Sequence, residues 1–261
     1  MHPSAPVLTP DPTRSPRVFV VIPSRWASSR LPGKPLADIA GRTMVERVYR
    51  RAAAARGIAG VLVATDDERI AAAVRAFGGR VALTRPDHAS GTDRIAEVAQ
   101  ELACDLVVNV QGDEPALEPA AIEAAVAPLA ADPAIPMGTL GAPLDPPADL
   151  PNPNTVKVLV DQQGFALYFS RAAVPFRREG GEAYASVLRH IGLYVYRRDF
   201  LLTLASLPRT PLERQESLEQ LRALEHGHRI RVVETPYTSV SVDTPEDLER
   251  VRRLAADGLL A

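Results

Sequence analysis

Short apolar runs alternate with longer amphipathic segments through the first half of the chain. The runs predict buried strands, because four to eight apolar residues bounded by polar turns are typical of a parallel sheet. The longer segments have helical composition, and Thr43 before the first of them is suited to an N-cap. The expected strands are 18–22, 61–65, 81–84 and 105–111, and the expected helices are 43–56, 67–77, 92–102 and one beginning past Pro119.

The pattern changes after a proline-rich connection at 143–153. Strands expected at 156–160, 165–169 and 187–196 have little helix between them, which is typical of a mixed or antiparallel extension. Helices are expected at 212–225 and 245–253. Repeated βα units predict an α/β fold, with a mostly parallel central sheet and helices on both faces. We expect a single domain over 17–257, made of a first part at about 17–150 and an extension at about 154–240.

Composition narrows the class of protein. The 261 residues carry a formal net charge of −2, so the chain lacks the global basic field that drives nucleic-acid binding. No apolar run approaches the roughly 18 residues that a membrane span needs. Residues 1–16 are rich in proline, serine and threonine without the apolar core of a signal peptide, and we expect a disordered extension there. The single cysteine, Cys104, is interpreted as a packing residue and suits a reducing compartment, so the expected localisation is cytoplasmic.

Positive charge is concentrated near the start of the chain. Ten arginines and lysines fall between Arg14 and Arg56, against two acids. Residues 22–35 read IPSRWASSRLPGKP and place Arg25, Arg30 and Lys34 in one loop after the first expected strand. Ligands in open α/β sheets bind at the carboxyl ends of strands, so three cations there are suited to a polyphosphate. The loop has neither a Walker P-loop nor a GxGxxG pattern, and a solvated basic loop is the alternative.

Two aspartates are candidate metal ligands. The segment 111–115, QGDEP, follows an expected strand, and Mg²⁺ prefers one or two carboxylates together with phosphate oxygens. Asp113 is the better ligand there, because Gly112 permits a sharp turn while Glu114 precedes a proline. Asp243 is the second candidate. Capping is the alternative for both, with Asp243 or Thr244 as the N-cap of the last expected helix.

Other polar segments have an ordinary structural interpretation beside the functional one. Ser90 fits a helix N-terminus that could meet an anion or a base edge, and simple capping explains it equally well. His190 lies in an expected strand, where a lone histidine is more often structural than catalytic. Glu213, Glu216 and Gln220 share one face of an expected helix, which is either a solvated acidic face or a hydroxyl-binding surface.

Lysine is rare in this chain. Of the 30 basic residues only Lys34 and Lys157 are lysines. A lysine retained among arginines can mark a site that needs a compact point charge, although two residues allow chance as the alternative.

Seven segments, taken in order and spacing, closely resemble the 3-deoxy-manno-octulosonate cytidylyltransferase (CMP-Kdo synthetase) family. The segments are IPSRWASSRLPGKP, TRPDHASGTDR, VNVQGDEP, LYFSR, LRHIGLY, LERQESLEQLR and VDTPEDL. The resemblance covers roughly residues 17–254. It implies a Rossmann-like nucleotidyltransferase fold whose extension serves sugar binding and dimerisation. It also implies a cytoplasmic, Mg²⁺-dependent homodimer that joins CTP to Kdo, giving CMP-Kdo and diphosphate for lipopolysaccharide biosynthesis.

The resemblance also implies a role for individual residues. Arg25, Arg30 and Lys34 are expected to hold the CTP phosphates, with Lys34 and Arg25 acting on the leaving diphosphate. The residues expected near the cytosine and its ribose are Arg85 and Ser90, and those expected to bind the metal are Asp113 and Asp243. The residues expected to contact Kdo are Gln111, His190, Tyr194, Glu219 and Gln220, with Arg171 or Arg178 near the sugar carboxylate. The departures from the family pattern are Trp26, where a smaller or phenolic aromatic is usual, and Ser241, where glycine is common.

Three alternatives remain. Activation of another sugar acid, 8-amino-Kdo or a sialic acid, is the nearest, because hydroxyl-binding residues do not separate these substrates. A non-catalytic nucleotide-binding protein would tolerate the loss of a metal carboxylate or of the Lys34 loop, and both are kept. A nucleic-acid-binding module would use the basic excess at 14–56, but no RNA-binding aromatic motif supports it.

Overall fold

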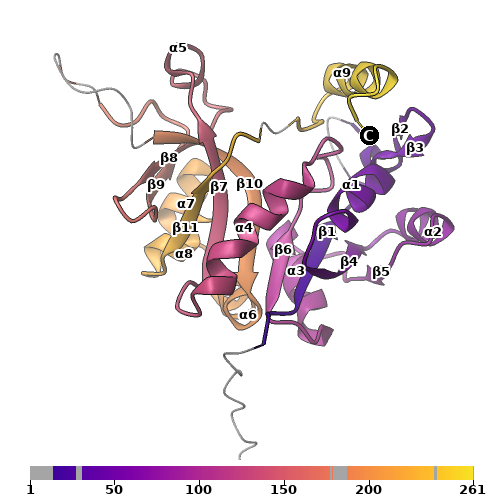
Figure 1. The fold of residues 1–261 in the computed structure, drawn as a ribbon, viewed down its shortest axis with the longest axis horizontal. Helices are drawn as coiled ribbons and strands as arrows, with labels where there is room; N and C mark the ends of the chain where they lie inside the picture. The colour runs from indigo at the N-terminus through magenta and orange to yellow at the C-terminus, as the bar shows by residue number, and fades with distance from the viewer. Residues whose placement is uncertain (1–13, 28–30, 177, 179–186, 238–239, 261) are drawn as a thin grey trace, which may run out of the picture.

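A central sheet carries the fold of this computed structural model (Figure 1). The structure describes residues 14–27, 31–176, 178, 187–237 and 240–260, and within them the sheet has nine strands. Residues 1–13 of the expected extension and Arg30 of the basic loop lie outside the described residues.

The first half of the chain builds the parallel part of the sheet. There β1 (Val18–Pro23) lies between β4 (Ile58–Thr65) and β6 (Leu106–Asn109), and β5 (Val81–Leu83) pairs with β4. All three pairings are parallel, so the carboxyl ends of these strands meet at one edge of the sheet.

The second half adds an antiparallel region. The long strand β10 (Val187–Arg197) runs antiparallel to β6 on one side and to β7 (Met137–Pro143) on the other. Strand β11 (Ile230–Glu234) extends the sheet beyond β7, and the hairpin of β8 (Lys157–Val160) and β9 (Ala166–Ser170) pairs with the start of β10. A separate short hairpin joins β2 (Asp38–Ile39) to β3 (Arg42–Thr43).

Helices cover both faces because the strands bury side chains on both. Val20 and Ile22 of β1 belong to one core cluster with residues of α1, α2 and α4, while Val21 belongs to another with residues of α3, α6 and α8. The helices are α1 (Met44–Ala53), α2 (Glu68–Ala76), α3 (Gly91–Glu101), α4 (Pro119–Ala131), α5 (Pro146–Asp149), α6 (Arg198–Ser206), α7 (Pro211–Glu216), α8 (Leu221–Glu225) and α9 (Pro245–Ala256), with a 3-10 helix η1 (Lys34–Leu36). In Figure 1, α9 lies beside the β2–β3 hairpin, far in sequence from it. None of the described helices is long and apolar enough to cross a membrane.

The predicted fold class is confirmed, and most predicted elements are present. The four strands and four helices expected before residue 132 correspond to β1, β4, β5, β6 and α1 to α4. Thr43 caps α1 as expected, since its side chain accepts a hydrogen bond from the Glu46 amide. The sequence interpretation missed β7, α6 and β11, and also the short elements η1, β2, β3 and α5.

The helix expected at 212–225 is wrong as a single element. It is divided into α7 and α8, with Ser217 in the left-handed region at φ 53°. The acidic face proposed for it is not solvated. Glu213 is fully buried against Arg222, and the Glu216 carboxylate accepts hydrogen bonds from Ser170 and from the backbone amide of Arg171.

Candidate functional site

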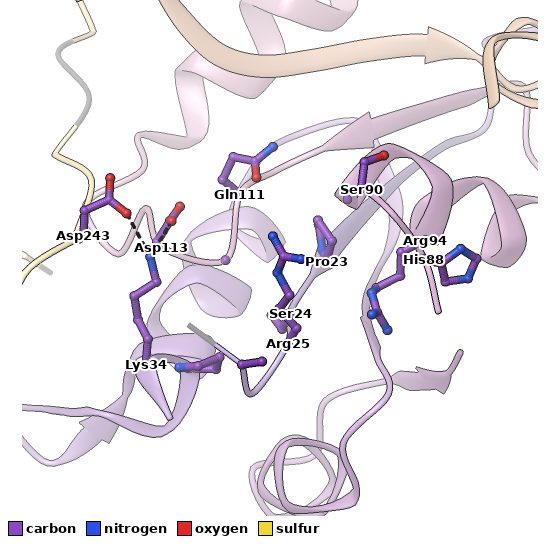
Figure 2. A pocket seen from close by; sticks show the side chains of 14 residues that line it. Pro23, Ser24, Arg25, Lys34, His88, Ser90, Arg94, Gln111, Asp113 and Asp243 are labelled. Atoms are coloured by element: carbon purple, nitrogen blue, oxygen red, sulfur yellow. Dashed lines mark hydrogen bonds and ion pairs between the residues drawn. The ribbon is translucent and has the colours of Figure 1, made fainter. Parts of the chain in front are cut away.

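A cavity of about 760 Å³ opens at the carboxyl ends of β1 and β6 (Figure 2). Four separate segments line it: the loop after β1, the start of α3, the loop after β6 and the segment before α9. The polar lining residues are Ser24, Arg25, Lys34, His88, Ser90, Arg94, Gln111, Asp113 and Asp243.

Lys34 connects three of these segments. Its ammonium donates to Asp113 Oδ2 at 2.7 Å, to the Val242 carbonyl at 2.8 Å and to Asp243 Oδ1 at 3.3 Å. Figure 2 shows the three side chains pointing toward one another at one end of the cavity. Because both carboxylates contact the same nitrogen, Asp113 and Asp243 are close enough to bind one cation together.

The loop after β1 is shaped to present Lys34. Gly33 has φ 71°, and a Cβ added there would lie 2.9 Å from the Trp26 ring, so glycine alone fits without strain. The guanidinium of Arg69 stacks on the same Trp26 ring, 3.5 Å from its centroid. Pro35 follows in the first turn of η1, where its missing amide donor costs nothing.

Backbone contacts bring the two aspartates together. The Val242 amide donates to the Asp113 carbonyl at 2.9 Å, joining positions that are far apart in the sequence. A Cβ at Gly112 would lie 2.8 Å from Ser24 Oγ, so the loop after β6 can approach β1 only with glycine there. Thr244 is the N-cap of α9, which resolves the choice left open by the sequence and leaves the Asp243 side chain with Lys34.

The donor set fits a hard divalent cation. Two carboxylates and the Val242 carbonyl surround one positive charge, and oxygen is the ligand that Mg²⁺ takes. Among the described residues, no group of three or more His, Cys, Asp and Glu side chains could hold a metal. A magnesium ion bound at Asp113 and Asp243 therefore needs oxygens from substrate or water to complete its shell.

The opposite side of the cavity is the N-terminus of α3. Ser90 is its N-cap and accepts a hydrogen bond from the Asp93 amide at 3.1 Å. Arg94 also lines the cavity although it is buried, and it pairs with Asp66 at 3.2 Å. Sequence reasoning did not single out Arg94. Arg85 lies outside this cavity, in a neighbouring groove, where it is mostly exposed and pairs with Glu97.

A second cavity of about 470 Å³ adjoins the first. Gly91, Gln111, Asp113 and Asp243 line both, so the pair of aspartates lies at the junction. The other predicted site residues that line the second cavity are Arg171, Tyr194, Glu219 and Gln220. Thr92, from the expected helix start, lines it as well, and the polar lining residues that the sequence did not indicate are Asn109, Tyr196, Ser217 and Arg222.

The second cavity presents several hydrogen-bonding groups. Thr92 Oγ1 donates to Glu219 Oε2 at 2.7 Å, and the buried Gln220 Nε2 has no hydrogen-bond partner among the described residues. Burial raises the pKa of the Tyr194 hydroxyl well above its ordinary value, and the nearby Tyr196 and Glu219 add to the shift. Tyr194 therefore keeps its proton at neutral pH and can donate a hydrogen bond to a ligand oxygen.

His190 lies beside Tyr194 and does not itself line the second cavity. Its ring packs edge-on to Phe169 and against Tyr194, with centroid distances of 5.0 and 5.5 Å, and its Nε2 lies 3.1 Å from Thr139 Oγ1. Burial lowers the pKa of His190 to about 3, so the ring is neutral at physiological pH. His190 does not line either cavity, but its ring contacts Tyr194, which lines the second.

The two candidate arginines differ in position. Arg171 lines the second cavity, and its Nε donates to the Glu216 carbonyl at 2.8 Å. Arg178 is exposed and lines neither cavity.

Comparisons with known proteins identify similar sequences and a similar solved structure. The cytidylyltransferase family model matches residues 19–230. The 3-deoxy-manno-octulosonate cytidylyltransferase of Syntrophotalea carbinolica is 61% identical over 90% of this chain and 96% of that protein. The protein of the same name from Geobacter sulfurreducens is 56% identical over 90% of this chain and 97% of its own length. A solved structure of CMP:2-keto-3-deoxy-manno-octonic acid synthetase complexed with CTP is 46% identical, with a TM-score of 0.88 over 93% of this chain and 99% of that one.

Proposed function

The chain belongs to the 3-deoxy-manno-octulosonate cytidylyltransferase family, and from that premise we propose that its two adjoining cavities transfer the cytidylyl group of CTP to Kdo. The products are CMP-Kdo and diphosphate. The supply of CMP-Kdo for lipopolysaccharide biosynthesis and a cytoplasmic location belong to the same proposal. The observation that carries it is the position of Asp113 and Asp243, at the junction of a cation-lined cavity and a cavity rich in hydrogen-bonding groups.

The first cavity is proposed to hold CTP. Arg25 and Lys34 face the space where a triphosphate would lie, and Arg30 belongs to the same loop by sequence. The N-terminus of α3, capped by Ser90, offers backbone donors to the nucleotide. Because Arg85 lies outside this cavity, its proposed contact with the base would require the loop before α3 to move.

The second cavity is proposed to hold the sugar acid. Tyr194, Glu219 and Gln220 offer donors and acceptors for its hydroxyl groups, and Gln111 lies between the two substrates. Arg171 is the proposed partner of the sugar carboxylate, because it lines this cavity and Arg178 does not. His190 is proposed to act by holding the Tyr194 ring in position.

The reaction is an in-line displacement. The anomeric hydroxyl of Kdo attacks the α-phosphorus, a new O–P bond forms, and the bond to the leaving diphosphate breaks with its electron pair. Lys34 and Arg25 stabilise the charge on the diphosphate, and the cavity walls hold the two substrates in line. Asp113 and Asp243 would hold magnesium, which would neutralise phosphate charge and lower the pKa of the attacking hydroxyl. The hydroxyl proton passes to solvent.

A homodimer is part of this proposal. The extension exposes two large apolar side chains, Leu167 on β9 and Phe176, with exposed fractions of 62% and 91%. Exposed apolar side chains of this size are suited to contact with a second copy of the chain, and Leu167 lies on a strand that pairs only with β8 among the described strands. Light scattering of the wild type and of a Leu167→Glu variant tests this. A dimer that the substitution dissociates is expected, and a wild-type monomer would contradict it.

Diphosphate release tests the proposed reaction. Purified protein with CTP and Mg²⁺ is assayed with Kdo, with 8-amino-Kdo and with N-acetylneuraminate. Kdo is expected to give the highest kcat/KM. Preference for one of the other two acids would assign the nearest alternative substrate, and no release with any of them would contradict the proposal.

A further inference from the structure

The Lys34 ammonium has the surroundings of a bound metal ion. All three of its donors are used, each toward an oxygen at 2.7 to 3.3 Å, and two of those oxygens belong to carboxylates. The side chain is 14% exposed, so little water competes with these contacts. The ammonium and a divalent cation bound to both carboxylates cannot occupy this position at the same time.

We propose that Lys34 is an internal competing cation, which keeps divalent ions out of the Asp113–Asp243 site until a nucleotide binds. The proposal rests on the proposed function, because it takes the triphosphate as the ligand that draws Lys34 away. In the ligand-free protein the ammonium neutralises two carboxylates that would otherwise repel each other. It also ties the segment before α9 to the loop after β6, through Val242 and Asp113.

The charge balance explains why the exchange needs a nucleotide. A divalent ion arriving alone must expel the ammonium from three oxygens and leave it without an anionic partner. A triphosphate arriving in the first cavity offers that partner, because Lys34 and Arg25 line the same space. The ammonium then moves to phosphate while the metal takes its place between the carboxylates. Nucleotide and metal therefore bind with positive coupling, and by linkage each strengthens the other equally.

Lysine content makes the exchange directly observable. The chain has only two lysines, and Lys157 is a built-in reference. Lys157 is fully buried, and its ammonium donates to the carbonyls of Asn152, Thr155 and Arg171, remote from the metal site in sequence. In protein labelled with ¹³C at lysine Cε, two side-chain signals are expected. Millimolar Mg²⁺ alone should leave both in place, and CTP with Mg²⁺ should move the Lys34 signal and leave that of Lys157.

Metal binding without nucleotide provides an independent test. Mn²⁺ binding is measured by electron paramagnetic resonance for the wild type, for Lys34→Met and for Arg25→Met. Lys34→Met should bind Mn²⁺ about tenfold more tightly than the wild type, a typical size for a coupling between sites. Arg25→Met is the matched control, since it removes one positive charge from the same loop without a contact to either aspartate. The Mn²⁺ affinity of Arg25→Met, measured without nucleotide, should stay within about twofold of that of the wild type.

Folding of the variant is followed by thermal melting. Lys34→Met is expected to melt lower than the wild type in EDTA and to recover with Mn²⁺, because the ion replaces the missing charge. Equal Mn²⁺ affinity in Lys34→Met and the wild type would overturn the proposal, as would equal tightening in both variants. A Lys34 signal that moves fully with Mg²⁺ alone would also overturn it. These measurements need neither a sugar acid nor turnover, so they can fail while the proposed reaction stands, or hold while it fails.

Discussion

A buried ion pair supports the loop that faces the second cavity, and breaking it should destabilise the protein. Arg222 donates to both oxygens of Glu213, from Nε at 2.9 Å and from Nη2 at 2.6 Å. The pair joins α7 to α8 across the interruption at Ser217 and lies beside the segment that carries Glu219 and Gln220. The perturbation is Arg222→Met, which keeps the length of the side chain and removes its charge.

The expected cost follows from burial. The side chains of Glu213 and Arg222 are 1% and 5% exposed, so the substitution leaves a carboxylate out of water without its main partner. Removing one member of such a pair typically costs about 3–5 kcal/mol. Glu213 keeps hydrogen bonds from the Thr210 amide and from Arg209, which offset part of the loss. We therefore expect the free energy of unfolding to fall by about 3 kcal/mol.

Urea denaturation measures this change. The matched control is Arg75→Met, which breaks an ion pair with Glu68 in which both side chains are more than half exposed. An exposed pair contributes at most about 1 kcal/mol. The displaced loop should also raise the KM for the sugar acid more than it lowers kcat. A loss for Arg222→Met no larger than that of the control would refute the reasoning.

Three further predictions concern single positions. Gly33→Ala should raise the KM for CTP about tenfold, because its Cβ would lie 2.9 Å from Trp26. Gly41→Ala shares the positive φ but has no atom within 4 Å of its added Cβ, and an equal KM change in that control would contradict the steric reason. His190 has its pKa lowered to about 3 and gains a proton on unfolding, so the free energy of unfolding should fall as pH drops below about 6.5. The fall should approach 2 kcal/mol between pH 7 and 5, measured by urea titration, and an unchanged slope in His190→Gln would contradict it. Lys157→Met should cost about 3 kcal/mol in the same assay, because it leaves three part-buried carbonyls without their donor, and a loss below about 1 kcal/mol would count against this.

The parallel half of the sheet could be predicted from sequence because its signals are local. Each strand is a short apolar run, each helix begins at a recognisable cap such as Thr43, and βα repetition predicts the pairing. By contrast, β7 has the sequence MGTLGAP, whose glycines and proline are poor strand formers. Strand β11 includes charged residues, since it lies at the edge of the sheet.

The interruption between α7 and α8 had no local signal. Residues 212–225 have a helical composition, and Ser217 is not a residue that usually breaks a helix by adopting a left-handed conformation. Tertiary contacts hold the two helices in place there, among them the pairing of Glu213 with Arg222. The expectation of one helix is therefore wrong, and so is the solvated acidic face, one of the two interpretations of its shared side.

The site could be predicted in part. The rule that ligands bind at the carboxyl ends of parallel strands places Lys34 and Asp113 near each other without a structure. Asp243 reaches them through tertiary contacts such as the Val242–Asp113 hydrogen bond, and the local sequence made it only a candidate, with capping as the alternative. Arg94 was missed because a buried charged residue leaves no mark in a periodic pattern.

Turnover of two aspartate variants tests the central claim most directly. The claim is that Asp113 and Asp243 act together on one cation at the junction of the cavities. Kdo-dependent diphosphate release is compared for Asp113→Asn, Asp243→Asn and the double variant, with thermal melting to establish that each is folded. Residues that act as one unit are non-additive, so each single change should abolish turnover about as completely as both together. A folded Asp243→Asn variant that retains near-wild-type turnover would contradict the account.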